Sequence, residues 1–201
     1  MLKPSQTLPE GYRAIGTFDI TASPRLVLIL NLVGLGIAAI AAWVFSALLA
    51  RLRPLEAKNA LAVEISSLGQ LFGIILGLLL LTALMMVLHE AAHGLFFWLF
   101  TRSRPKFAFK VVYAYAAAPG WFIPRWQYLI IGLAPLGLLS LLGVGLMAVI
   151  PPQGFLWLLV FLVGNAGGAV GDLWVMAWLM RQPPGVVAED RGDAVTLYRL
   201  F

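Results

Sequence analysis

The sequence predicts an all-α integral membrane protein with about four transmembrane helices. Hydrophobic residues make up 61% of the 201 residues and charged residues only 11%, whereas about 25% of the residues in a soluble domain are charged. Four apolar segments each exceed the roughly 20 residues that a helix needs to cross a bilayer. This number of charged side chains is too small to cover a water-facing surface. We therefore expect one membrane-embedded domain over residues 1–201.

The first two apolar segments begin at recognisable helix starts. The first covers about 24–50, and Ser23 followed by Pro24 fits an N-cap and a first helical position. No cleavable signal peptide is evident before it, so we expect this helix to be retained. The second covers about 68–100, where Ser67 and Gln70 have the spacing of a capping box. It is longer than one crossing requires, so it should tilt, protrude or break.

The last two apolar segments are bounded by prolines. The third covers about 126–150 and begins just after Pro124, and the fourth covers about 154–180 and ends before Pro183 and Pro184. Proline lacks the amide hydrogen that an interior helical residue donates, so it marks helix boundaries. These limits predict two further crossings with a very short connection between them.

The connection between the second and third segments differs from the others. Bulky side chains alternate with smaller or polar ones from Phe107 to Tyr115, and this period of two indicates a strand. Pro119 and Gly120 then form a turn signal. Two interpretations of 102–125 stay open: a short β-hairpin or re-entrant element at the membrane surface, or an amphipathic connecting loop.

The positive charges are distributed unevenly between the two ends of the predicted helices. With four crossings, eleven Lys and Arg residues fall on the side of the two termini and the second loop, and three fall on the opposite side. The positive-inside rule therefore predicts that both termini are cytoplasmic. The formal net charge of +5 is explained by this topology, so we expect the lipid bilayer, and no nucleic acid, as a partner.

One short motif inside the second segment carries chemistry. The only two histidines of the chain, His89 and His93, stand four residues apart and therefore project from one helix face. Glu90 follows the first, which gives the pattern His-Glu-x-x-His, in which two imidazoles bind Zn²⁺ and the glutamate is the general base. Ionisable groups within a membrane segment usually serve a function. The alternative is that the histidines are polar contacts between helices.

A zinc site of this kind needs a third protein ligand and leaves the fourth position to water. The chain has no cysteine, and among its acidic residues only Glu90 and Asp172 lie well inside apolar segments. Asp172 is therefore the predicted third ligand. His93 and Asp172 each lie nine residues before an arginine at a helix end, which puts both roughly 13 Å from the same side. The alternative is a buried aspartate that hydrogen-bonds without a metal.

The segment before Asp172 is rich in small residues. It contains four glycines between residues 164 and 171, and such residues let membrane helices approach one another closely. Asn165 lies two helical turns before Asp172 and can share its face. It could orient a substrate or hydrogen-bond to a metal ligand, or act only as a contact between helices.

Three stretches of the chain resemble a known family. Leu8 to Tyr12, His89 to Gly94 and Asn165 to Asp172 are similar to the bacterial putative zincin peptidase family, a domain of unknown function. Through it, the chain resembles the site-2 protease superfamily of intramembrane zinc metalloproteases. The resemblance implies a location in the bacterial cytoplasmic membrane, a Zn²⁺ cofactor, and hydrolysis of peptide bonds in membrane-associated substrates.

The leading functional hypothesis is therefore an intramembrane zinc metalloprotease that acts on a membrane protein or peptide. In it His89, His93 and Asp172 hold the metal, and Glu90 takes a proton from the attacking water. Two other classes stay open: a catalytically silent scaffold or binding protein of the same fold, and a metal-handling membrane protein. The sequence does not specify an oligomeric state.

Overall fold

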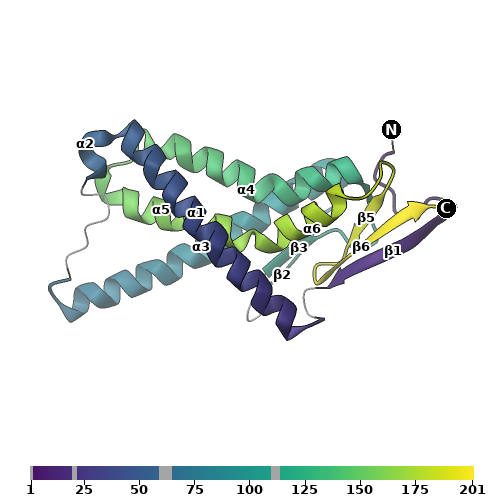
Figure 1. Cartoon of the computed structure of the whole chain (residues 1–201), viewed down its shortest axis with the longest axis horizontal. Helices are drawn as coiled ribbons and strands as arrows, with labels where there is room; N and C mark the ends of the chain where they lie inside the picture. Colours follow the sequence, from purple (N-terminus) through teal and green to yellow (C-terminus); the bar gives the residue numbers. More distant parts are fainter. Residues whose placement is uncertain (1, 20–21, 59–64, 110–113) are drawn as a thin grey trace.

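A bundle of long apolar helices carries a small β-sheet at one of its ends (Figure 1). The computed structural model describes residues 2–19, 22–58, 65–109 and 114–201. Within them, three helices are long and apolar enough to cross a membrane, and a bent pair would make a fourth crossing. The N-terminus and the C-terminus both lie at the end of the bundle that carries the sheet.

The helices begin close to the predicted positions. The main helices are α1 (Pro24–Leu52), α3 (Leu68–Thr101), α4 (Arg125–Met147), α5 (Phe155–Gly168) and α6 (Val170–Met180), with a short α2 (Pro54–Ala57) and a 3-10 turn, η1 (Pro152–Gly154). The N-cap of α3 is Ser67, whose side chain accepts a hydrogen bond from the Gln70 amide as predicted. The sequence thus located the starts of α1, α3 and α4 correctly.

The predicted fourth crossing over 154–180 is not one straight helix in the structure, although the segment can still make one bent crossing. Two helices, α5 and α6, replace it and meet at a bend of 42°, with Ala169 between them. Each glycine in a helix interior lowers helix stability by about 1 kcal/mol relative to alanine. Four glycines lie between residues 164 and 171, around this bend. The bend makes a new helix start just before Asp172, which lies in the first turn of α6.

The prediction of an all-α fold is confirmed only in part, because the described residues are mostly helical but also contain six strands. Four form an antiparallel sheet in the order β1-β6-β5-β4, from β1 (Tyr12–Asp19), β4 (Phe122–Pro124), β5 (Val187–Asp190) and β6 (Ala194–Leu200). The other two, β2 (Lys106–Phe109) and β3 (Ala114–Ala117), pair antiparallel. Of the two interpretations of 102–125, the strand-containing one is therefore confirmed, although residues 110–113 lie outside the described part.

The larger sheet packs directly on the helix ends that approach the predicted site. One core cluster joins Phe97 of α3, Ile131 of α4 and Leu179 of α6 to Ile123 of β4 and Leu197 of β6. All five side chains are nearly inaccessible to solvent. Burial of such side chains contributes roughly 1.5–3 kcal/mol each, so the sheet fixes these three helix ends relative to one another.

Large apolar side chains cover the outside of the helices. Trp43 is 74% exposed, Leu79 64% and Leu141 72%, and many others on α1, α3 and α4 are similarly exposed. Soluble proteins rarely expose contiguous apolar surfaces of more than a few hundred Å². The helix surfaces therefore fit a lipid environment, in agreement with the composition.

A buried polar contact ties the turn between β5 and β6 to α4. The Tyr128 hydroxyl donates a hydrogen bond to Oδ2 of Asp190 at 2.6 Å, and the Gly192 amide donates to Oδ1 at 2.8 Å. Both side chains are buried. Burial raises the pKa of Asp190 to about 6, and the two hydrogen bonds offset only part of that effect.

This buried carboxyl group should make the stability of the protein pH-dependent. Because its pKa is higher in the folded protein than the ordinary value of 3.8, the folded state binds the proton more tightly than the unfolded state does. Its contribution to stability is therefore complete below about pH 4 and is lost as the pH rises to about 6. We expect the unfolding free energy in detergent to fall across that window, and the fall to be smaller in Asp190→Asn. Equal slopes in the two proteins would contradict the assignment.

Candidate metal centre

Helix α3 brings the residues of the His-Glu-x-x-His motif to one place. His89 and His93 lie on successive turns of the same face, and their ring centroids are 5.1 Å apart with the planes at 72°. His93 is buried, whereas His89 and Glu90 are half-buried. Two imidazoles on one helix face can therefore approach the same point from different directions.

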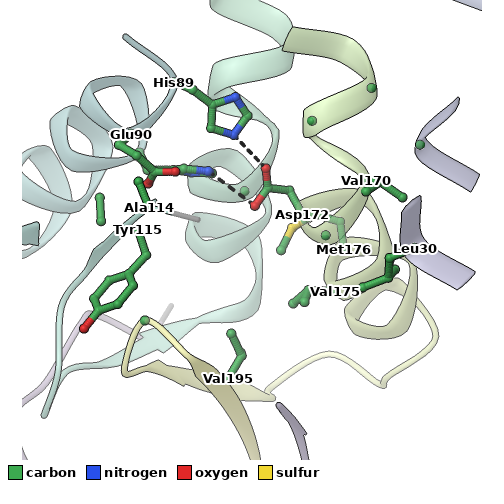
Figure 2. Close-up of a pocket in the computed structure, with 18 of the residues that line it drawn as sticks. Leu30, His89, Glu90, Ala114, Tyr115, Val170, Asp172, Val175, Met176 and Val195 are labelled. Carbon is green, nitrogen blue, oxygen red and sulfur yellow. Dashed lines mark hydrogen bonds and ion pairs between the residues drawn. The ribbon is translucent and has the colours of Figure 1, made fainter. Parts of the chain in front are cut away.

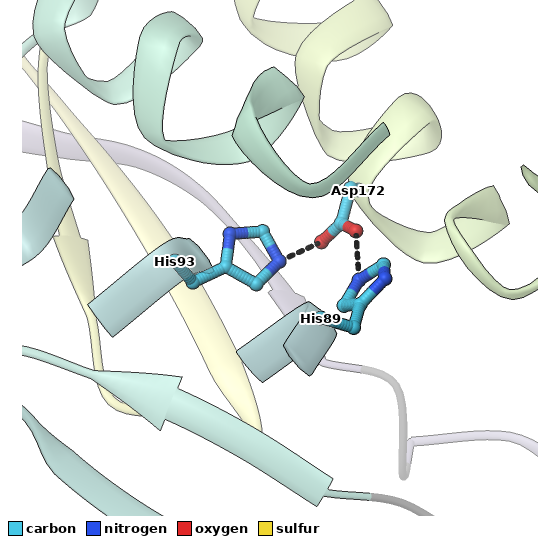
Figure 3. A group of neighbouring side chains, drawn as sticks. All are labelled: His89, His93 and Asp172. Atoms are coloured by element: carbon cyan, nitrogen blue, oxygen red, sulfur yellow. Dashed lines mark hydrogen bonds and ion pairs between the residues drawn. The ribbon is translucent and has the colours of Figure 1, made fainter. Parts of the chain in front are cut away.

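Asp172 reaches this point from α6. Its Oδ2 atom lies 3.1 Å from Nε2 of His89, and its Oδ1 atom lies 3.3 Å from Nε2 of His93 (Figure 3). One ligand atom from each of the three residues lies within 4.8 Å of the other two. The structure thus brings together the three residues that the sequence predicted as ligands. They come from two helices, and His89 and Asp172 are 83 residues apart in the chain.

The opposite nitrogen of each imidazole faces a hydrogen-bond acceptor. Nδ1 of His93 lies 2.9 Å from the carbonyl oxygen of Ile131, and Nδ1 of His89 lies 3.0 Å from Oδ1 of Asn165. The Asn165 amide nitrogen donates to the carbonyl of Pro135 at 3.3 Å. Because a carbonyl only accepts, this bond turns Oδ1 of Asn165 toward His89. Both rings therefore carry hydrogen on Nδ1 and direct Nε2 toward Asp172.

The donor set fits a zinc ion. Zinc binds histidine nitrogen at about 2.0–2.1 Å and carboxylate oxygen at about 2.0–2.2 Å in a tetrahedron, so neighbouring ligand atoms lie about 3.3 Å apart. Nε2 of His89 lies 3.1 Å from Oδ2 of Asp172 and Nε2 of His93 lies 3.3 Å from Oδ1, so each imidazole is at the ligand-to-ligand distance from one carboxylate oxygen. A neutral imidazole with hydrogen on Nδ1 presents a lone pair at Nε2, so the two rings and the facing carboxylate offer three ligand atoms to one cation.

Glu90 lies beside the group and faces strand β3, not Asp172 (Figure 2). The backbone amide of Ala116 is a hydrogen-bond partner of its carboxylate. Gly94, one turn further along α3, lets the hairpin approach, because a Cβ atom there would clash with the Phe107 ring. The glutamate is thus near the histidines without taking part in their contacts with Asp172.

A cavity of about 1080 Å³ opens onto these residues. Its walls come from helices α1, α3, α4, α5 and α6, from strands β1, β3 and β6, and from the turn between β5 and β6. They include Leu30, Gly34, Ala114, Tyr115, Val175 and Gly192. Most of the labelled side chains in Figure 2 are apolar, while His89, Glu90 and Asp172 form the polar part of the wall. A chain in an extended conformation could lie in a space of this size next to β3.

The glycine-rich segment contributes to both packing and the cavity. A Cβ atom at Gly167 would lie 3.0 Å from Ala38 and 3.1 Å from the carbonyl of Gly34, so this glycine lets α1 and α5 approach closely, as the packing interpretation holds. Gly167 also lines the cavity, together with Gly168 and Gly171, and a Cβ atom built on either of the last two would point into open space.

Sequence reasoning missed two features of this centre. The carbonyl groups of Ile131 and Pro135 on α4 are backbone atoms, and no side-chain motif identifies them. Pro135 itself was a visible signal, because it is a proline in the middle of an apolar segment. The Tyr128–Asp190 contact was also missed, since Asp190 belongs to a strand that lies beyond the last predicted crossing.

A known protein family matches the part of the chain that contains this centre. The model of the family described as putative zincin peptidase matches residues 82–187. The chain belongs to this family. The matched range contains His89, Glu90, His93, Asn165 and Asp172, and it leaves out β1 and β6. No curated protein and no solved structure matched the chain.

The contact of Asn165 with His89 makes a testable prediction for this zincin-family centre. Asn165 is completely buried, and partners that orient a metal-bound histidine typically contribute 10- to 100-fold to metal affinity. We expect Asn165→Leu, which has similar volume but no acceptor, to weaken zinc binding by about 10- to 100-fold in a competition titration. Asn31→Leu, on the exposed part of α1, is the control. Equal affinities of the two variants would argue against the orienting role.

Proposed function

We propose that this protein is an intramembrane zinc metallopeptidase that hydrolyses peptide bonds of membrane-associated substrates. The observation that carries the proposal is the convergence of both Nε2 atoms on Asp172 with Glu90 beside them. The family description points to the same chemistry, and the apolar helices support a membrane location. A relation to the site-2 proteases is part of the proposal.

His89, His93 and Asp172 would hold the metal through Nε2, Nε2 and a carboxylate oxygen. A zinc ion bound there would lower the pKa of a coordinated water and polarise the carbonyl under attack. With three protein ligands, one coordination position remains for water or substrate. The bonds from Nδ1 to Asn165 and Ile131 hold both rings in the orientation that this requires.

Glu90 would serve as the general base. Its carboxylate takes a proton from the attacking water and then passes it to the nitrogen of the leaving amine, so the peptide bond breaks with no net change in protonation of the enzyme. Its place beside His89 and outside the contacts with Asp172 supports this role, because a base must be near the water and not bound to the metal.

The substrate would lie in the cavity as an extended chain alongside β3. This strand pairs with β2 on one side, and the amide of Ala116 on it already interacts with the Glu90 carboxylate. Addition of a peptide strand to a sheet edge supplies main-chain hydrogen bonds whatever the sequence of the peptide. An extended peptide also exposes its carbonyl groups, which a helical membrane segment does not.

We also propose that both termini face the cytoplasm. The two termini lie at the same end of the bundle (Figure 1), and eleven of the fourteen basic residues belong to that side of the predicted topology. The partners would be the lipid bilayer and a membrane protein or peptide substrate.

The direct test is cleavage by the purified protein in liposomes. Membrane-embedded reporter peptides that cover varied sequences should be cut, cutting should stop on chelation, and one equivalent of Zn²⁺ should restore it. Zinc binding without cleavage of any reporter would favour a silent scaffold. Zinc transfer across the liposome membrane would favour a metal-handling protein.

A further inference from the structure

Helix α4 contains a proline at a place where a helix loses stability. Pro135 is buried inside α4 (Arg125–Met147). A proline in a helix interior removes the hydrogen bond to the carbonyl four residues earlier, and its ring presses on that same carbonyl, at a cost of about 3 kcal/mol. The carbonyl four residues before Pro135 is that of Ile131.

The carbonyl that Pro135 leaves without its helical donor is the one that contacts His93. Nδ1 of His93 lies 2.9 Å from it. Ile131 and His93 are both buried, so water does not readily serve as a hydrogen-bond partner for either group. A buried carbonyl or ring N–H without a partner would destabilise the protein by about 1–3 kcal/mol. The imidazole of His93 therefore supplies the hydrogen bond that the Ile131 carbonyl lacks within the helix.

We propose that Pro135 is a positioning residue of the metal centre, which frees the Ile131 carbonyl to accept a hydrogen bond from Nδ1 of His93. This inference rests on the proposed metal site. With hydrogen held on Nδ1, His93 presents the lone pair of Nε2 toward Asp172, 3.3 Å away. An alanine at 135 would supply an amide hydrogen in the same helix, and that hydrogen would compete with His93 for the Ile131 carbonyl.

The same turn of α4 also acts on the other histidine, by a different route. The Pro135 carbonyl accepts from the Asn165 amide nitrogen at 3.3 Å, and Oδ1 of Asn165 then faces Nδ1 of His89. Any residue at 135 has a carbonyl, so this contact does not depend on proline. Replacement of Pro135 should consequently affect His93 directly and His89 little, which makes His89 an internal reference.

Two replacements at position 135 separate the amide hydrogen from every other property of proline. Pro135→Ala restores the N–H group. Lactic acid at 135, introduced by suppression of a stop codon, has the same methyl side chain as alanine but an ester oxygen in place of the N–H group. We expect Pro135→Ala to bind zinc about 10- to 100-fold more weakly than wild type and the lactic acid variant to bind within a few-fold of wild type.

A second measurement reads the hydrogen bond without any activity. The chain has only two histidines, so ¹⁵N-histidine labelling gives two resolvable Nδ1–H signals in zinc-loaded protein. In Pro135→Ala the His93 signal should move upfield and exchange faster with solvent, while the His89 signal stays in place. The lactic acid variant should retain both signals of the wild type.

Three results would decide against the inference. One is wild-type zinc affinity with an unchanged His93 signal in Pro135→Ala. Another is equal weakening by alanine and lactic acid, which would assign the effect to the proline ring. If wild type binds no zinc, the proposed metal site fails, and the His93 signal of the metal-free proteins still tests Pro135: the same signal in wild type and Pro135→Ala would overturn the inference.

Discussion

Replacing Glu90 with glutamine should lower peptide-bond hydrolysis by at least about 100-fold while zinc stays bound. Glutamine keeps the shape of glutamate and can still accept from the Ala116 amide, but it cannot take up the proton of the attacking water. General acid–base catalysis typically contributes 10²–10⁴-fold. The three proposed ligands are untouched, and a neutral amide is cheaper to bury than a carboxylate, so the metal content and the fold should survive.

The measurement is cleavage of a membrane-embedded reporter by wild type and Glu90→Gln with matched zinc content. Glu10→Gln provides the control, because Glu10 is an exposed glutamate outside both helices of the metal centre. It should cleave at the wild-type rate. Cleavage at that rate by Glu90→Gln as well would remove Glu90 from the role of general base and would require another proton acceptor.

The sequence was sufficient for the helices because each long helix is a local signal. Residues 68–101 form one long and mainly apolar segment, and the cap at Ser67 is encoded within four residues of the helix start. The His89–His93 pair was predictable for the same reason, since a spacing of four fixes a shared helix face. Asp172 required one non-local step, namely that only two acidic residues lie within apolar segments.

The larger sheet could not be read from local pattern. Its pairing of β1 with β6 joins Thr17 to Thr196, across nearly the whole chain, and both strands lie in short stretches of mixed polarity at the two termini. Strand preferences depend on the neighbours that a strand acquires on folding. Here those neighbours include Phe97 and Leu179 at the ends of α3 and α6, which no window around residues 12–19 contains.

The bend at Ala169 was a missed consequence of glycines that were noticed for another reason. The glycines predict close helix packing, and this is found at Gly167. The sequence does not specify at which residue a glycine-rich helix breaks. The bend matters for the site because it starts α6 two residues before Asp172. A helix start leaves backbone amides without internal partners and favours a carboxylate nearby.

Removing the Asp172 carboxylate should abolish stoichiometric zinc binding. Asp172 lies between the two Nε2 atoms, at 3.1 and 3.3 Å, and it is the one proposed ligand that α3 does not carry. Loss of a partner that only orients a ligand costs 10- to 100-fold in affinity, so loss of a ligand should cost at least about 100-fold. Two neutral imidazoles would then remain, too few protein ligands to hold zinc against water.

The informative comparison is Asp172→Ala beside Asp190→Asn, with metal content measured after purification and affinity measured by competition. Asp190 is also a buried carboxyl group that lines the cavity, but its oxygens are taken by Tyr128 and Gly192. Asp190→Asn should therefore keep its zinc. Undiminished zinc in Asp172→Ala would take Asp172 out of the site, whereas loss in both variants would trace the loss to the fold. Loss in Asp172→Ala alone would assign the third ligand to Asp172, which lies in the first turn of α6 directly after the bend at Ala169.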